Sequence, residues 1–350
     1  MSSVEKRQEA KDVGRDPIPR AAEVAKLKGK HQSCWRGLIA LVVAIGGGLA
    51  LHLVVGKNEP LQKETWLYTK FLCGALGITI LAGGVQFFWP WLRSWMREMC
   101  PILAAGFVAL AIGEAITTGL RLLPPSYFPS PAGILYTMVE DRAELLNNAG
   151  HSFALLLKGY VLGLIVGLVV GVCIGWFGAA RYWGMPVLKL VGPIPATAWV
   201  PIAMIVTSFI GAPSGSAAVS LVALAVWFPV AMLTASGISN VRSSLLDVAR
   251  TLGAGRGYLI FRVAIPAAMP SIFIGLFMGL SAAFLTLIVA EGVGVKAGLG
   301  WYIEWARGWN EYKKVFAALV IMAAFFSAIM TLLFKIRDYV LVWQKGTIKW

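Results

Sequence analysis

Charged residues are scarce in this chain. Only 14% of its 350 residues are Asp, Glu, Lys or Arg, against about 25% in ordinary soluble domains, while 58% are hydrophobic. The hydrophobic residues gather in long runs, and a helix needs about 20 such residues to cross a bilayer core about 30 Å thick. The composition therefore predicts an integral membrane protein.

Metal-ligating and catalytic residue types are also few. The three histidines, His31, His52 and His151, are scattered along the chain, and none has a second His at metal-ligand spacing. The four cysteines have no paired spacing, so they indicate neither a metal site nor a disulfide framework. Neither GAGRGYL nor GVGVKAG completes the phosphate-loop pattern of nucleotide-binding proteins. We expect no metal, no bound cofactor and no enzyme activity in this chain by itself.

Eight segments are long and apolar enough to cross a membrane. They lie near residues 35–55, 70–92, 100–122, 151–178, 187–210, 214–238, 264–290 and 315–336. None shows the alternation of apolar and polar residues that is typical of outer-membrane barrels. The predicted fold class is all-α, a polytopic membrane protein with about eight transmembrane helices.

The distribution of basic residues predicts the orientation of these spans. An even number of spans puts both termini on one side, and cytoplasmic segments carry an excess of Lys and Arg. With cytoplasmic termini, 21 of the 31 basic residues lie inside, and without the first 36 residues the count is still 12 to 10. The net charge of +14 fits this orientation and contact with anionic lipid better than nucleic-acid binding. A partner-binding role for the basic tail, residues 1–34, is the alternative.

A short polar stretch, DVARTLGAGRGYLIFRVAIPAAMPSI, separates two apolar runs on the predicted cytoplasmic side. Ser244 and Asp247 have the spacing of a capping box at a helix start. Gly253 predicts where this helix ends, and Pro266 suits the start of the next span. Apolar residues recur on one helix face at Leu245, Val248 and Leu252. We expect a short amphipathic helix on the inner face of the membrane.

This stretch resembles the EAA motif of ABC importer permeases. Asp247-Val-Ala249, then Gly253, then Val263-Ala-Ile265-Pro266 keep the spacing of that motif, with Asp247 in place of its glutamate. In that family the loop is the coupling helix, which docks into a groove of a cytoplasmic ATPase subunit. The resemblance implies ATPase-coupling roles for Asp247, Ala249, Arg250, Gly253, Arg256 and Pro266.

Flanking segments narrow the resemblance to the permeases of nitrate, sulfonate, taurine and bicarbonate importers. They are LPPSYFPSPAGIL, GPIPATAWVPIAMI, FPVAMLTASGISNV and LIVAEGVGVKAGLGWYIEWA. The resemblance implies a type I importer-like core of six helices over residues 100–350, with the coupling helix at about 244–256. Residues 35–99 would add two helices to that core. The solute, the role of these two helices and that of the tail stay open.

The resemblance also implies an assembly in the bacterial cytoplasmic (inner) membrane. Two ATPase subunits would bind ATP and Mg. The family's permeases pair with a second copy or a close relative, and we expect a homodimer that completes the solute path. An extracytoplasmic binding protein would deliver the solute. ATP binding would close the ATPase subunits and tilt the attached spans, which switches access from one side to the other.

Span five carries Pro193, Pro195 and Pro201 around two polar or aromatic side chains. Prolines break the helix, and broken helices at membrane depth often line transport paths. A simple packed kink is the alternative. The candidate path residues are Pro195, Thr197, Trp199, Pro201, Trp227, Ser281, Thr286 and Glu291. The hydroxyl residues among them could instead bond their own helix backbone.

Three charged residues lie within or at the ends of spans. Glu114 falls inside span three, where an acid is either functional or a paired structural group. It carries the alternative function, a proton-coupled secondary transporter. Glu291 ends span seven and suits a gate or a docking contact for the binding protein. Lys158 either snorkels outward or faces the route of an anion.

Span four carries a strict four-residue repeat of glycine. The repeat comprises Gly159, Gly163, Gly167, Gly171 and Gly175. It places small residues on one helix face, where another helix can approach closely. We predict that this face packs against a helix and does not line the path.

Overall fold

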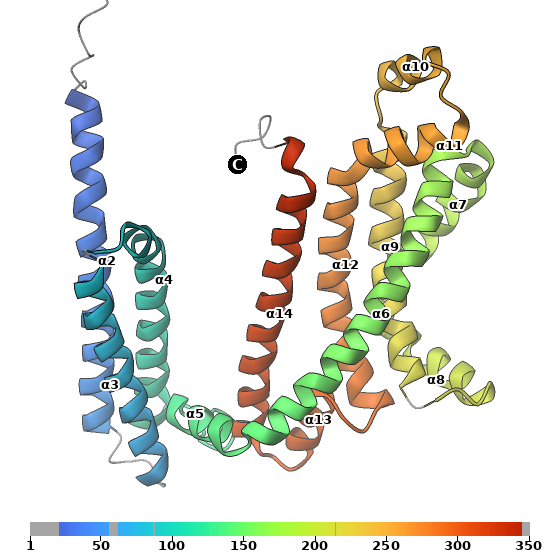
Figure 1. Cartoon of the computed structure of the whole chain (residues 1–350). Helices are drawn as coiled ribbons and strands as arrows, with labels where there is room; N and C mark the ends of the chain where they lie inside the picture. Colours follow the sequence, from blue (N-terminus) through green and yellow to red (C-terminus); the bar gives the residue numbers. More distant parts are fainter. Residues whose placement is uncertain (1–20, 56–61, 87, 214, 345–350) are drawn as a thin grey trace, which may run out of the picture. The chain divides into compact units, whose positions relative to one another are not determined.

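The computed structural model describes residues 21–55, 62–86, 88–213 and 215–344, and no strand occurs within them (Figure 1). The chain divides into two compact units, Met1–Tyr136 and Thr137–Trp350. Seven helices are long and apolar enough to cross a membrane, or eight if one bent pair counts as a single span. The predicted all-α, polytopic fold class is confirmed.

The first unit is built on three long helices, α2 (Ala21–Val55), α3 (Gln62–Val85) and α4 (Pro90–Glu114). A π-helical turn, η2 (Ala115–Gly119), follows α4, and α5 (Pro131–Glu140) runs across the boundary with the second unit. A core cluster of the first unit includes Leu38, Leu41, Ile45, Met96 and Cys100, which join α2 to α4. Because α2 begins at Ala21, part of the predicted tail is helical. Residues 1–20 lie outside the described residues.

Several observed spans begin earlier than predicted. Spans four and seven extend back to Arg142 and Arg256, and the second and third spans are displaced. The second candidate span covers Lys63–Val85 instead of 70–92, and the third covers Trp91–Gly119 instead of 100–122. The reason is Pro90, which lies at the first positions of α4, where a helix does not need its missing N–H group. The aromatic run around it therefore separates two helices. Helix α4 belongs to the first compact unit, which ends at Tyr136. The division at 99/100 between the two additional helices and the permease core stays a prediction.

Glu114 is paired in this first unit. Its Oε1 lies 2.6 Å from Nδ1 of His52, and Nε2 of His52 lies 3.1 Å from the carbonyl oxygen of Thr65. His52 is 0% and Glu114 1% exposed, and the His52 ring packs edge-on against Tyr68. The partner of Glu114 is thus a histidine whose second nitrogen is held by α3, an arrangement typical of a structural group.

The second unit contains five spans and several short helices (Figure 1). Its elements are α6 (Arg142–Trp176), α7 (Gly178–Val191), η3 (Ala196–Trp199), α8 (Val200–Phe209), α9 (Ser216–Ser239), α10 (Ser243–Thr251), α11 (Arg256–Tyr258), η4 (Leu259–Ala264), α12 (Ile265–Gly294), α13 (Leu299–Gly308), α14 (Tyr312–Val340) and η5 (Val342–Gln344). Helix α9 packs extensively against both α6 and α12, and it is the most buried of the spans. It therefore forms the centre of this unit.

The glycine repeat of span four is the surface on which α9 packs. All five glycines are buried. A Cβ added to Gly159 would lie 2.6 Å from Cβ of Val222, and one added to Gly175 would lie 2.8 Å from Cβ of Ile238. Real Cβ atoms do not approach other atoms so closely, so α6 and α9 are in backbone-to-side-chain contact along their length. The predicted packing role of the repeat is confirmed.

Candidate functional site: a broken span, a buried carboxylate network and a short amphipathic helix

Span five is broken at its prolines. Helix α7 ends at Val191, the short helix η3 begins after Pro195, and the axis of the pair turns by 89°. The ring of Phe228 occupies the space beside Gly192, where no side chain would fit. The predicted break is confirmed. At the break, the backbone at Gly192 packs against the Phe228 side chain of α9.

A cavity of about 400 Å³ lies at this break, between η3, α9 and α12. Five of the eight predicted path residues line it: Pro195, Thr197, Trp199, Trp227 and Thr286. Thr197 and Thr286 give it hydroxyl groups, and the rest of the wall is mainly apolar and aromatic. The sequence thus identified residues from three separate elements that meet at one cavity. Their role in transport remains a prediction.

Two of the remaining path candidates lie elsewhere on these helices. Pro201 is exposed in the first turn of α8, where a proline is tolerated, and it does not line the cavity. The hydroxyl of Ser281 donates a hydrogen bond to the carbonyl oxygen of Phe277 in its own helix, at 3.1 Å. This is the backbone bond that the sequence left open as the alternative for Ser281.

Glu291, the eighth candidate, is enclosed in a hydrogen-bonded network. Its Oε2 accepts hydrogen bonds from the hydroxyl of Ser152 at 2.9 Å and from the backbone N–H of Gly300 at 2.8 Å. The hydroxyl oxygen of Ser152 also accepts from the N–H of Leu299, at 2.8 Å. Glu291 is 0% exposed and does not line the cavity at the break. A docking contact at this carboxylate would require the network to open first.

The network includes residues that the sequence did not single out. Asn148 Oδ1 accepts a hydrogen bond from the N–H of Gly298 at 2.9 Å, one turn of α6 before Ser152. Gly298 has φ +129°, and a side chain there would collide with the Glu291 carboxylate. The only sign of this network in the sequence is the pair of polar residues Asn148 and Ser152, spaced i and i+4 in α6. Together these groups join α6, the end of α12 and the start of α13.

A second contact that the sequence missed links α13 to the start of α6. The hydroxyl of Tyr302 donates a hydrogen bond to Asp141 Oδ2 at 2.9 Å, and Lys314 Nζ lies 3.7 Å from the same oxygen. Burial, together with the adjacent Asp141 carboxylate, raises the pKa of Tyr302 well above its usual value. The phenol therefore stays protonated and remains a donor at any physiological pH.

The polar stretch between the two apolar runs forms the predicted short helix, α10 (Figure 1). The predicted capping box is wrong: the helix begins one residue earlier than Ser244, its N-cap is Arg242, and no side chain caps it. Asp247 instead pairs with Arg250 one turn along, at 2.9 Å. The Asp247 carboxylate thus interacts with a side chain at i+3 on the same helix and not with the N–H groups at the helix start.

The end of α10 agrees with the prediction. Gly253 has φ +84°, and its N–H donates to the carbonyl of Arg250 at 2.9 Å. The N–H of Ala254 donates to the carbonyl of Ala249 at 3.0 Å, which completes a Schellman motif. The turn thus depends on Gly253, whereas Gly257 lies in the short helix α11.

The apolar face of α10 is uncovered. Leu245, Val248 and Leu252 are 50%, 60% and 83% exposed, whereas Leu246 and Ala249 are half-buried on the side that meets the protein. Beneath α10 is a polar cavity of about 540 Å³. Arg250 and Arg256, both predicted coupling residues, line that cavity together with Arg181.

Pro266 lies inside a continuous candidate span, Arg256–Gly294. The π-helical turn η4 precedes it, and Pro266 follows at the first positions of α12. A wider π turn accommodates residues that interrupt the regular hydrogen-bond ladder. Helix α10 packs against η4, and η4 continues directly into α12.

Comparison with known proteins places this geometry in a family. Residues 159–341, just over half of the chain, match the model of the family described as "Binding-protein-dependent transport system inner membrane component". The chain belongs to this family. The match includes the broken span, α10 and Glu291 with its neighbours at 298–300, but not Asn148 or Ser152, and it lies entirely in the second unit. Glu114 and the first three spans lie outside it.

Individual relatives have the same character. The chain is 30% identical over 231 residues to the putative aliphatic sulfonates transport permease protein SsuC of Bacillus subtilis, covering 65% of this chain and 80% of that protein. It is 27% identical over 242 residues to the taurine transport system permease protein TauC of Escherichia coli, covering 67% and 86%. The resemblance to ABC permeases of the sulfonate and taurine group is confirmed.

Among solved structures, an inward facing conformation of the MetNI methionine ABC transporter is similar to this chain, and the alignment covers 57% of this chain and 98% of the transporter chain. The TM-score is 0.49 and the identity 17%.

Proposed function

We propose that this chain is the permease subunit of an ATP-driven importer for a small organic anion of the sulfonate and taurine class. Membership of the family supports a role in binding-protein-dependent transport. The similarity to SsuC, a sulfonate permease, and TauC, a taurine permease, supports the solute class, with nitrate and bicarbonate as further members of the predicted group. A proton-coupled transporter based on Glu114 is not favoured, because Glu114 is held by His52 outside the matched region.

The observation that carries the proposal is the uncovered apolar face of α10. This nine-residue helix leaves two leucines and a valine exposed. Fully burying a side chain of this kind against a partner contributes about 1.5–3 kcal/mol. Exposed apolar patches of this kind mark sites where another protein binds. A groove on a cytoplasmic ATPase subunit is the partner that the family resemblance predicts.

The packing supports a route from α10 to the broken span. Helix α10 packs on η4, η4 continues into α12, and α12 packs along α9. Both α9 and α12 line the cavity at the break, through Trp227 and Thr286 respectively. When two ATPase subunits bind ATP and Mg and close together, they would pull α10. This would tilt α12 relative to α9 and the other elements that line the cavity at the break. A second permease copy would form the other wall, with both termini cytoplasmic and the binding protein outside.

Affinity purification of the tagged protein from its native membrane, followed by mass spectrometry, tests the proposal. We expect a soluble protein with a phosphate-loop motif to be recovered with the wild-type chain. Val248→Asp places a charge in the centre of the apolar face of α10 and is expected to abolish this recovery. Ser243→Asp is the matched control, since it adds the same charge on another side of α10, at its first residue, where acids are favourable.

The outcomes separate clearly. Loss of the ATPase with Val248→Asp but not with Ser243→Asp, at equal membrane insertion, supports the coupling role. Recovery of a stable wild-type chain without any ATPase would contradict the proposed function and return attention to Glu114. An extracytoplasmic binding protein recovered in the same experiment would provide the reagent with which to compare taurine, alkanesulfonates, nitrate and bicarbonate.

A further inference from the structure

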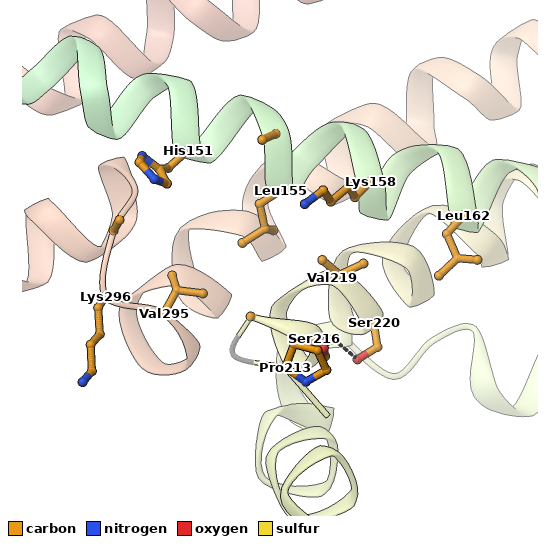
Figure 2. Close-up of a pocket in the computed structure, with 13 residues that line it drawn as sticks. His151, Leu155, Lys158, Leu162, Pro213, Ser216, Val219, Ser220, Val295 and Lys296 are labelled. Carbon is orange, nitrogen blue, oxygen red and sulfur yellow. Dashed lines mark hydrogen bonds between the residues drawn. The ribbon is translucent and has the colours of Figure 1, made fainter. Parts of the chain in front are cut away.

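A second and larger cavity, of about 690 Å³, lies in the second unit away from the break of span five (Figure 2). Helix α6 contributes His151, Leu155 and Lys158 to its wall. The start of α9 contributes Ser216 and Val219, and the turn after α12 contributes Val295 and Lys296. In the predicted orientation, these elements lie toward the outer side of the membrane.

The cavity is cationic. Lys158 and Lys296 both line it, and neither forms an ion pair within the part of the chain that the structure describes. Figure 2 shows Lys158 running along α6 with its ammonium directed toward Leu155, while Lys296 extends outward from the opposite rim. The nearby acid, Glu291, is buried and does not line this cavity, and its Oε2 accepts hydrogen bonds from Ser152 and Gly300.

The same cavity offers an apolar wall. Leu155, Val219 and Val295 line it between the two lysines. Its volume lies in the range of pockets that hold small molecules, about 300–1,000 Å³. A cation beside an apolar wall is complementary to an anionic group attached to a short carbon chain.

A third hollow lies between this cavity and the one at the break and shares lining residues with both. A shallower hollow of about 380 Å³ shares Leu162 and Ser220 with the cationic cavity. It also shares Leu224 and Trp227 with the cavity at the break. Ser216, Ser220, Leu224 and Trp227 recur at three- and four-residue intervals, so one face of α9 lines all three hollows.

We propose that the cationic cavity is a binding site within the permease for the anionic group of the transported solute, with Lys158 as its principal cation and Lys296 at its rim. The inference rests on the proposed function and deepens it. The solute binds first beside Lys158, then moves along this face of α9 to the cavity at the break of span five. Selection of the anion is thus shared between the binding protein and the permease itself.

Binding of defined sulfonates to the purified complex tests this site. The complex is reconstituted in phosphatidylcholine nanodiscs, and its thermal unfolding is followed with increasing propanesulfonate at constant ionic strength. Propanesulfonamide is the neutral probe of similar shape. We expect propanesulfonate, but not propanesulfonamide, to raise the melting temperature of the wild type.

Variants of Lys158 assign the effect to the cavity. Lys158→Gln should raise the half-saturating sulfonate concentration by about tenfold or more, as loss of one charge-assisted contact would. Lys158→Arg keeps the cation and should largely restore binding. The matched control is Lys189→Gln, which removes an exposed lysine from α7 that does not line this cavity and should leave the half-saturating concentration unchanged.

Three results would overturn the proposal: no stabilisation by the sulfonate, equal stabilisation by the sulfonamide, or equal affinity in the wild type and Lys158→Gln. A lipid phosphate is the other source of such an anion. If only nanodiscs containing phosphatidylglycerol stabilise the protein through Lys158, the site holds lipid and the proposal fails. Recovery of the ATPase with the wild type is measured separately, so failure of this site is distinguishable from failure of the proposed function.

Discussion

Ser152 donates a hydrogen bond to the carboxylate of Glu291, 139 positions later in the chain, and both side chains are fully buried. The contact joins α6 to the end of α12, and the same carboxylate oxygen also accepts from the N–H of Gly300 at the start of α13. Three elements thus meet at one oxygen atom. This geometry indicates that Glu291 stabilises the second unit.

Substitution of Glu291 separates a stabilising role from a role in transport. Glu291→Gln keeps an oxygen that can accept both hydrogen bonds, so we expect a melting temperature close to that of the wild type and nearly normal uptake. Glu291→Leu leaves the hydroxyl of Ser152 and the N–H of Gly300 without their acceptor, at a cost of about 1–3 kcal/mol for each buried group. The measurement is thermal unfolding in detergent beside solute uptake. Normal stability with abolished uptake in Glu291→Gln would instead support a gate.

The contact between α6 and α9 predicts a strong effect of a single methyl group. In Gly167→Ala the new Cβ would lie 2.9 Å from Cβ of Val230, so the helices must separate locally, and we expect a loss of about 1–3 kcal/mol. Gly150→Ala is the matched control, because it lies on the same helix in open space and should be neutral or slightly stabilising. Thermal unfolding of the two variants checks this. Equal stability of both would show that α6 and α9 are not in tight contact.

The sequence predicted those features that are determined within a single segment of the chain. It did not predict those that depend on contacts between distant segments. Long apolar runs predicted the all-α membrane fold, and the glycine repeat predicted its own packing, because both are properties of a single segment. Pro90 was misread since an aromatic run around a proline has the composition of a span. The Glu291 network could not be predicted, because it joins Asn148, Ser152 and the turn at 298–300, which only the fold brings together. The same is true of Glu114, whose partner His52 lies 62 positions away.

The turn that ends α10 predicts a difference between two neighbouring glycines. Gly253 and Gly257 both have open space where a Cβ would be added, but only Gly253 has a positive φ, +84°. Gly253→Ala therefore strains the Schellman motif by about 1–2 kcal/mol, whereas Gly257→Ala should favour the helix in which it lies. We expect Gly253→Ala to reduce recovery of the ATPase by co-purification, and Gly257→Ala to leave it unchanged. A larger loss with Gly257→Ala would contradict the assignment of the turn.

The pair formed by His52 and Glu114 predicts a non-additive effect on the first unit. His52→Phe leaves a buried carboxylate without its partner, and Glu114→Leu leaves a buried imidazole nitrogen in the same position, so each single variant should be destabilised by about 3–5 kcal/mol. The double variant replaces the pair by apolar groups and should be more stable than either single variant. A double-mutant cycle of thermal unfolding measures the coupling. Recovery of the ATPase should be the same in every folded variant, since α10 lies in the other unit. If the double variant is the least stable of the three, or if Glu114→Leu stops uptake in a stable protein, Glu114 acts in transport and the structural interpretation is wrong.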